Sequence, residues 1–209
     1  EDGIRDVERS RGLGDVYKRQ NEYLALVERV VEEGKTTGPN QSEDLAGYTK
    51  LNFQRMKRVA KTTKSNADLL QTLSDQKHDL AFLIITEAWC GDAAQSVPVF
   101  TKLAQEAGVE VKLALRDENP ELIDQHLTNG GRSIPIVIAL DKSTFKPLFS
   151  WGPRPIDLQK IVIAHRDATE PKAPYSEFVQ QVQLWYTKDK QQAIQAELKL
   201  SLDKNLSLG

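Results

Sequence analysis

Cys90 is the only cysteine of the chain, and it lies in the motif Ala88-Trp-Cys-Gly-Asp-Ala93. The motif closely follows an apolar run, Leu80–Ile85, and leads into a segment with helical spacing of apolar residues, residues 92–106. A thiol at a helix N-terminus faces unpaired backbone N–H groups and the positive end of the helix dipole, which favour the thiolate. Such settings lower the pKa of a cysteine from about 8.5 to roughly 3.5–7.5. Because the thiolate is the nucleophile in thiol chemistry, Cys90 is the predicted catalytic residue.

The residues beside Cys90 would shape its reactivity. Gly91 would allow a partner backbone or a second sulfur to come close, and Trp89 would shield one side of the thiol. Asp92 can cap the following helix, but its negative charge opposes thiolate formation, so the sequence does not fix the pKa of Cys90. A lone cysteine is also often a small buried apolar side chain. We favour the reactive interpretation because the motif lies at a strand-to-helix junction.

A second feature is the proline of Arg132-Ser-Ile-Pro135, at the start of an apolar run that ends at Leu140. Proline cannot donate a hydrogen bond within a sheet, so it belongs at the start of a strand or in a special turn. A cis peptide bond before Pro135 would present the Ile134 backbone to an extended ligand. Ile134 and Pro135 are therefore predicted substrate-binding residues, with an ordinary strand-start proline as the alternative.

The elements that must position these residues alternate between strands and helices. Short apolar runs predict strands, and the first run is continuous, as in a strand covered on both faces. The expected strands are residues 80–85, 109–115, 134–140 and 146–151. Helices are expected over residues 92–106, after the first strand, over residues 119–131, after the second, and onward from Pro155, after the last. This order predicts an α/β sandwich whose mixed sheet begins with parallel strands and ends in an antiparallel hairpin.

Further helices are predicted on both sides of this core. Three precede it, the second with Ser42 as its N-cap, and a long final helix spans Tyr175–Leu200. The side chains expected to face inward from the final helix are Phe178, Val182 and Trp185. We divide the chain into four parts: an extension (residues 1–20), an N-terminal helical segment (21–76), the core (77–167) and a C-terminal helical extension (168–209).

The composition excludes several classes of protein. With 28 basic and 30 acidic residues among 209, and 39% hydrophobic residues, the chain is neither a basic nucleic-acid binder nor disordered throughout. No apolar run approaches the roughly 20 residues that cross a bilayer. The three histidines are scattered, so neither a metal nor another cofactor is expected. Lysines within residues 50–64 form one helix face, which solvation explains better than an anionic partner.

The first 20 residues are excluded from the fold. They combine five acids, five bases and three glycines without an apolar period, and they resemble a translated cloning scar. A genuine flexible extension is the alternative. A single cysteine suits a reducing compartment, so the cytoplasm is the expected location, although a signal before residue 21 of the native gene could have been lost.

Taken together, these motifs resemble the thioredoxin superfamily. Trp89-Cys-Gly-Asp-Ala93, followed by Pro98, is similar to the thioredoxin motif Trp-Cys-Gly-Pro-Cys and its helix-kinking proline. Ile134-Pro135 is similar to the cis-proline turn, and Trp151-Gly152 to the loop before the last helix of that fold. The resemblance covers roughly residues 66–166 and implies a thioredoxin-like sandwich. Further segments resemble a bacterial group of thioredoxin family proteins: Gly34–Gly38, Tyr48–Asn52, Trp151–Pro155 and Leu184–Tyr186.

The departures from the thioredoxin pattern decide what the resemblance implies. Ala93 stands where the resolving cysteine would be, and Ile84 stands where thioredoxins have a buried acid. The resemblance therefore implies a one-thiol cycle, in which Cys90 attacks a disulfide, or takes up a small thiol, and an external thiol resolves the mixed disulfide. Arg132 could pair with a carboxylate of a small thiol, or be an ordinary surface arginine. Arg154 could border the same groove.

Two functions remain open at this point. The first is a monothiol thiol-disulfide oxidoreductase that acts through Cys90 on a disulfide-containing protein or a low-molecular-weight thiol. The alternative is a binding module that grips an extended peptide or partner protein through the proline turn without turnover. The flanking helices favour this alternative or a homodimer interface. A peroxidase is a weaker third hypothesis, because an activated thiolate can be oxidised to a sulfenic acid.

Overall fold

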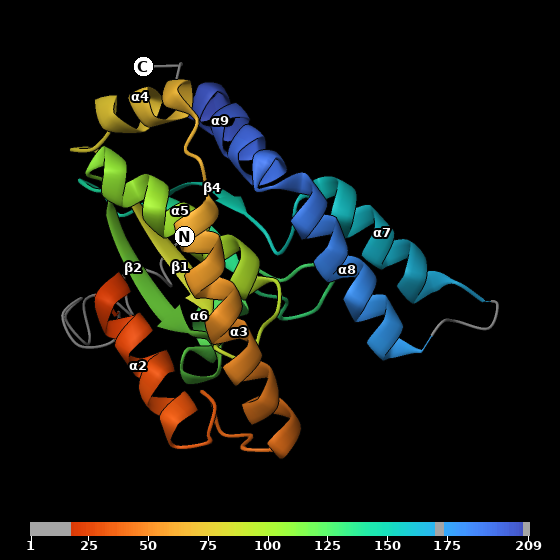
Figure 1. The fold of residues 1–209 in the computed structure, drawn as a ribbon. Coiled ribbons are helices and arrows are strands. Elements are labelled where there is room, and N and C mark those ends of the chain that lie inside the picture. Colours follow the sequence, from red (N-terminus) through yellow and green to blue (C-terminus); the bar gives the residue numbers. More distant parts are fainter. Residues whose placement is uncertain (1–17, 170–173, 207–209) are drawn as a thin grey trace.

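A four-stranded mixed sheet forms the centre of the computed structural model, which describes residues 18–169 and 174–206 (Figure 1). The strand order is β2-β1-β3-β4. The strands are β1 (Leu80–Thr86), β2 (Glu110–Leu115), β3 (Ile136–Asp141) and β4 (Pro147–Trp151). β1 runs parallel to β2 and antiparallel to β3, and β3 and β4 form an antiparallel hairpin. The predicted α/β architecture, with parallel strands first and the hairpin last, is confirmed.

The central strand β1 carries the residues that lead to the cysteine motif. All of its residues from Phe82 to Thr86 are buried, and Ile84 is paired with Leu113 of β2 and Val137 of β3. A strand with neighbours on both edges and covered faces is expected to be continuously apolar. The ring of Phe82 packs edge-on against Phe100 of α5, with centroids 6.1 Å apart. The apolar run therefore anchors the start of the motif in the core.

Three helices build a layer on the sheet (Figure 1). α5 (Ala93–Ala107) packs on β2, α3 (Glu43–Thr62) packs on α5, and α2 (Gln20–Glu32) contacts both α3 and β2. The predicted N-cap of α3 is present, because the Ser42 side chain accepts the backbone N–H of Leu45 at 3.4 Å. α3 therefore has a defined start and a fixed position beside the cysteine motif.

The connection between β2 and β3 is less helical than predicted. Within the expected helix over residues 119–131, only α6 (Pro120–Ile123) is helical, after the short η1 (Arg116–Glu118). Pro120 occupies the first turn of α6, as predicted. Asn129 and Gly130 adopt left-handed φ values of 50° and 76°. A turn rather than a longer helix therefore leads into β3.

The C-terminal segment forms two helices where one was expected. α8 (Tyr175–Asp189) and α9 (Gln192–Leu206) are separated by Lys190 and Gln191, whose φ values are 54° and 65°. The Asp189 carboxylate accepts the backbone N–H of the residue four positions later, at 3.1 Å, and so caps the new helix. The prediction of one continuous helix was wrong because no glycine or proline marks this break.

α9 docks on the core, whereas α8 extends along one side of the molecule (Figure 1). α9 contacts α4 (Ala67–Asp75), α5 and β4. Its fully buried side chains are Ile194, Leu198 and Leu202. α8 buries Phe178, Val182 and Tyr186, whereas Trp185, expected inward, is only partly buried. α7 (Ile156–Asp167) lies against α8, where the His165 ring stacks on Phe178 with centroids 3.7 Å apart.

The first described residues already belong to the fold. Of residues 1–20, those before Lys18 lie outside the described residues. Lys18 forms an antiparallel bridge with Leu113 of β2, with both backbone hydrogen bonds at 2.8 Å, and α2 begins at Gln20. The expectation that nothing folds before residue 21 therefore does not hold for residues 18–20.

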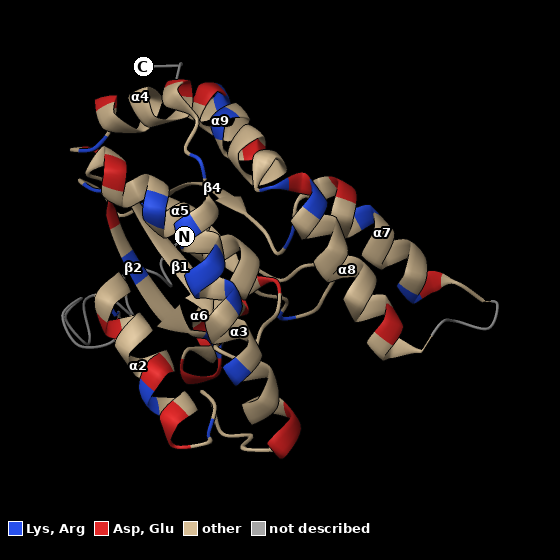
Figure 2. Cartoon of the chain, viewed as in Figure 1, with Lys and Arg blue, Asp and Glu red and all other residues tan. Residues whose placement is uncertain are grey.

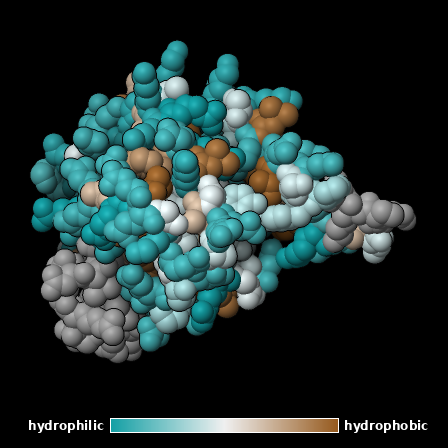
Figure 3. Space-filling model, turned by 60° about the horizontal axis from the view of Figure 1, so that its bottom comes forward, coloured by the Kyte–Doolittle hydropathy of each residue, from teal (hydrophilic) through white to brown (hydrophobic). Residues whose placement is uncertain are grey.

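The face of the molecule shown in Figure 3 is mainly polar. Hydrophilic side chains cover most of the face shown in Figure 3, and hydrophobic side chains form small patches between them. Among the helices of the described residues, none is long and apolar enough to cross a membrane.

Candidate functional site

A cleft of about 810 Å³ surrounds the cysteine motif. Cys90, Gly91 and Ile134 lie along it, and two helices that flank the core contribute side chains from either side. The lining residues of α3 are Asp44, Leu45, Tyr48 and Arg55, and those of α8 are Tyr175, Val179 and Gln183. Chain segments far apart in the sequence therefore meet around one sulfur.

The thiol of Cys90 is largely enclosed by its neighbours. Only 8% of the residue is exposed, its S–H donates to the backbone oxygen of Ile134 at 3.3 Å, and the Ala93 N–H donates to Sγ at 3.5 Å. Burial, and then the nearby charge of Asp92, raise the pKa of Cys90 to about 12. The hydrogen bonds at the start of α5 act in the opposite direction but are outweighed. The sequence left the pKa of Cys90 open, and in the structure burial and Asp92 outweigh the helix start, so the resting group at neutral pH is the thiol.

The proline turn lies directly against the thiol. The Ile134–Pro135 peptide bond is cis, as is Gly152–Pro153 in the neighbouring loop. Gly152 has a φ of 130°, and a Cβ atom on it would lie 2.2 Å from the backbone oxygen of Pro135. Only glycine allows this approach. The loop before α7 is therefore pressed onto the turn, which keeps Ile134 beside Cys90.

Asp92 is held by two side chains that come from later in the chain. Its carboxylate pairs with Arg154 at 2.7 Å and accepts the hydroxyl of Tyr186 at 2.9 Å. Burial raises the pKa of Asp92, while Arg154 and Tyr186 lower it. The Asp92 side chain forms no helix cap, so it joins the motif to α8 in place of the capping role that the sequence allowed.

Comparison with known proteins identifies the family. A thioredoxin family model matches residues 38–171, which is more than half of the chain. The chain belongs to the thioredoxin superfamily. No curated protein matches it significantly.

Two solved structures share the fold of this thioredoxin-superfamily protein. A protein of unknown function from Pseudomonas aeruginosa has a TM-score of 0.54 and 13% identity, and the match covers 90% of this chain and 98% of the other. An HIV epitope-scaffold has a TM-score of 0.51 and 14% identity, and the match covers 82% of this chain and 94% of the other. At these identities the likeness concerns the fold alone.

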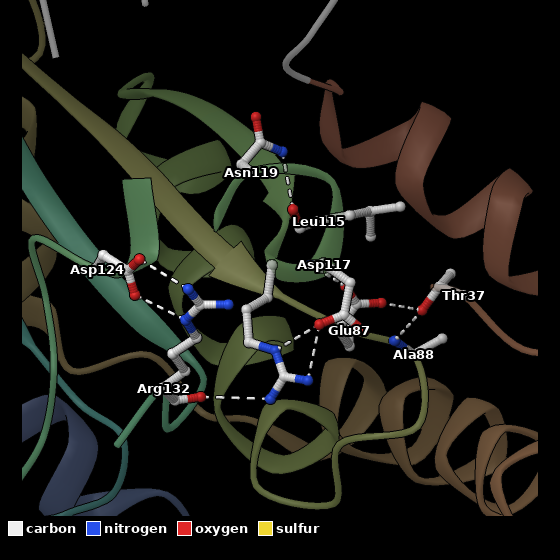
Figure 4. Close-up of polar contacts among 9 residues, drawn as sticks. Thr37, Glu87, Ala88, Leu115, Asp117, Asn119, Asp124 and Arg132 are labelled. Atoms are coloured by element: carbon white, nitrogen blue, oxygen red, sulfur yellow. Dashed lines mark hydrogen bonds and ion pairs between the residues drawn. The ribbon is translucent and has the colours of Figure 1, made fainter. Parts of the chain in front are cut away.

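Trp89 and Arg132 line the cleft, but each is held by a neighbour. The guanidinium of Arg116 stacks over the Trp89 ring at 4.6 Å from its centroid. Arg132 forms two hydrogen bonds with Asp124, at 2.6 and 2.7 Å (Figure 4). Arg132 holds the pKa of Asp124 below its ordinary value. In this thioredoxin-superfamily protein, the arginine expected to take a substrate carboxylate already has a carboxylate partner.

Glu87 is a buried acid of the site that the sequence analysis missed. It is 1% exposed, its carboxylate accepts the backbone N–H of Asp117 at 2.9 Å, and it also accepts the Thr37 hydroxyl (Figure 4). Burial raises the pKa of Glu87 to about 7 against the lowering effect of these hydrogen bonds. Thr37 in turn accepts the backbone N–H of Ala88 at 2.9 Å. The signal available in the sequence was an acid directly at the end of a buried strand.

Asn52 and Arg55 are the other residues that the sequence analysis did not assign to the site. Asn52 is fully buried, and its amide nitrogen donates to the backbone oxygen of Ala88 at 3.1 Å. Its amide oxygen accepts Nη1 of Arg55 at 2.9 Å. Arg55 lines the cleft. An asparagine within the apolar side of a predicted helix was the only available signal, and it predicts no specific partner.

The site offers no ready place for a metal ion. Nowhere in residues 18–169 and 174–206 do three or more His, Cys, Asp or Glu side chains gather in a way that could hold one. What the arrangement offers is a recessed thiol, a backbone turn and a group of arginines around a cleft.

Proposed function

We propose that this protein is a binding module of the thioredoxin fold, which holds an extended peptide segment of a partner protein in the cleft against the Ile134–Pro135 turn. The observation that carries the proposal is the enclosure of Cys90, which is 8% exposed and bonded to Ile134; this burial and the neighbouring Asp92 raise its pKa to about 12. A thiol in this state is protonated at neutral pH and is a poor nucleophile. Ala93 replaces the second sulfur that a dithiol cycle would need.

The turn offers what an extended ligand requires. Ile134 lines the cleft, and its backbone N–H donates no hydrogen bond within the described residues. A buried backbone donor normally has a partner. An extended peptide satisfies such a group by pairing its own carbonyl oxygen with it, as a strand does at a sheet edge.

The walls of the cleft also fit a peptide. Tyr48 of α3 and Tyr175 of α8 both line it and are 39% and 73% exposed. Exposed aromatic side chains offer large contact areas at a low cost in conformational entropy. The single cysteine fits a reducing compartment such as the bacterial cytoplasm, where we propose that the module acts.

A selection from a library of random seven-residue peptides tests the binding function. The protein and a Cys90→Ser variant should select the same peptides, and reductant should not release them. The proposal fails if capture requires Cys90 and is reversed by a reducing agent, because the ligand is then held as a mixed disulfide.

A monothiol oxidoreductase is the second candidate, favoured by one observation. Cys90 lines the cleft, and its Sγ lies 3.3 Å from the oxygen of the residue before the cis-proline. In this reaction the Cys90 thiolate attacks a disulfide R–S–S–R′, forms Cys90–S–S–R and releases R′–S⁻. An external thiol R″–SH then forms R–S–S–R″ and returns the proton and the free thiol of Cys90.

Alkylation kinetics separate the two candidates. The reaction of Cys90 with iodoacetamide, followed by mass spectrometry from pH 6 to 11, should stay slow until strongly alkaline pH for the binding module. A midpoint below pH 8, together with an adduct from an oxidised low-molecular-weight thiol that Cys90→Ser lacks, would establish the oxidoreductase instead.

A further inference from the structure

Four arginine side chains line the cleft, and three of them already have a carboxylate partner. Each of the three lies within 2.8 Å of a carboxylate oxygen: Arg116 of Asp117, Arg132 of Asp124, and Arg154 of Asp92. Arg55 is the exception, because it forms no ion pair with any described residue. Among the described residues, one cation of the cleft therefore has no carboxylate partner.

The position of Arg55 is fixed by a buried side chain. Asn52 is fully buried and bonded to the backbone of Ala88, and its free oxygen holds Nη1 of Arg55 at 2.9 Å. Nη1 also lies 3.9 Å from the place that a Cβ atom on Gly91 would occupy. The guanidinium is therefore held beside the cysteine motif, and within residues 18–169 and 174–206 most of its five N–H donors remain for another acceptor.

The helix that carries Arg55 supplies no acid near it. Residues 48–64 contain no Asp or Glu, and the acids of α3 are confined to its first turn (Figure 2). Asp44 also lines the cleft, but it precedes Arg55 by eleven residues, which is about 16 Å along a helix. The two ends of the α3 wall therefore differ in charge, with the positive end at Gly91.

The environment of Arg55 disfavours an isolated cation. The side chain is half-buried, and burial together with the nearby Arg58 lowers its pKa. By contrast, Lys57 on the same helix is exposed and pairs with Glu28 at 3.7 Å. Burying part of a charge is unfavourable unless an opposite charge and hydrogen bonds compensate it. A bound carboxylate would supply both, and the planar guanidinium suits its two oxygens.

We propose that the peptide bound in this cleft carries an Asp or Glu side chain whose carboxylate pairs with Arg55 beside Gly91. This proposal rests on the proposed binding function, because it specifies the ligand of the same cleft. A peptide fits better than a small free anion because the same cleft presents two tyrosine side chains and the Ile134 N–H, which donates to no other described residue. The Asp44 end of the wall should disfavour a second acid there.

The test is the random seven-residue selection repeated with three variants. The unaltered protein should select peptides with an acidic residue at one position, and Arg55→Gln should lose this preference. Lys61→Gln, which removes an exposed charge from the same helix outside the cleft, should keep it. For one selected peptide, Arg55→Gln and replacement of the peptide acid by its amide should each weaken binding roughly 10- to 100-fold. Both changes together should weaken binding no further than either alone.

Each outcome of this selection has a defined meaning. Peptides that bind without any acidic residue, or that bind Arg55→Gln unchanged, overturn the acidic ligand but leave the binding function standing. If no peptide is selected, the binding function fails and the acidic ligand fails with it. Arg55→Lys keeps the charge, so it should retain more affinity than Arg55→Gln. Equal loss in both variants while the fold is intact by circular dichroism would refute the role of charge.

Discussion

Replacing Glu87 by glutamine should remove a pH dependence from the stability of the protein. The pKa of this buried carboxyl is raised from 4.5 to about 7, and each pKa unit corresponds to about 1.4 kcal/mol. Between these pH values the folded protein keeps a proton that the unfolded chain has released. The free energy of unfolding should therefore fall as the pH rises through this window, by about 3 kcal/mol in total.

Urea denaturation of the protein and Glu87→Gln at intervals from pH 4 to 8 measures this effect. Glutamine has no charge to bury, and it can still accept the Asp117 N–H and meet Thr37. The difference in the free energy of unfolding between the two proteins should change by about 3 kcal/mol across the range, with Glu87→Gln gaining at high pH. Glu121→Gln, which removes an exposed acid of α6, controls for loss of one charge. Parallel curves for the protein and Glu87→Gln would refute the assignment of a buried, late-ionising carboxyl.

Three further substitutions test the site and its supports. Asp92→Asn removes the second cause of the high pKa of Cys90, so the pKa should fall by roughly 1–2 units and alkylation by iodoacetamide at pH 10 should become roughly 10- to 50-fold faster. An unchanged rate would contradict the electrostatic coupling. Gly152→Ala places a Cβ atom 2.2 Å from the oxygen of Pro135 and should cost at least about 3 kcal/mol in urea denaturation; near-neutrality would show that the loop does not press on the turn. Leu198→Ala empties a fully buried position of α9 and should cost about 2–5 kcal/mol, whereas a loss under about 1 kcal/mol would mean that α9 is not docked.

The order of strands and helices was predictable because it depends on local patterns. The continuous apolar run of β1, the Ser42 cap and Pro120 at the start of α6 are each read from a few adjacent residues. The break at Lys190 was not predictable in this way, because an ordinary residue adopts a left-handed φ there. Local propensity is a weak guide where tertiary packing decides the backbone.

The sequence predicted where the site lies better than it predicted the protonation state of Cys90 and the side chains around it. The motif and the proline turn could each be recognised from a few adjacent residues, and the structure brings them together at the Cys90–Ile134 hydrogen bond. The state of Cys90 depends on how closely Asp92 and the turn enclose it, and Asp92 is in turn fixed by Tyr186, which lies 94 residues away in the chain. The Asn52–Arg55 pair lies on α3, and nothing in the cysteine motif predicts that this helix contacts it. The burial of Cys90, Asp92 and Asn52 depends on contacts between segments far apart in the sequence, so local patterns do not predict it.

Because α8 lines the cleft, proteins with the same core but a different helix at this position would bind different ligands. The family match ends at residue 171, whereas α8 begins at Tyr175 and supplies one wall of the cleft. Two relatives could therefore share the sheet, the cysteine and the proline turn yet present different openings to a partner. Changes in α8 would then alter recognition without disturbing the sheet, so ligand preference should depend on α8 as well as on Arg55 of α3.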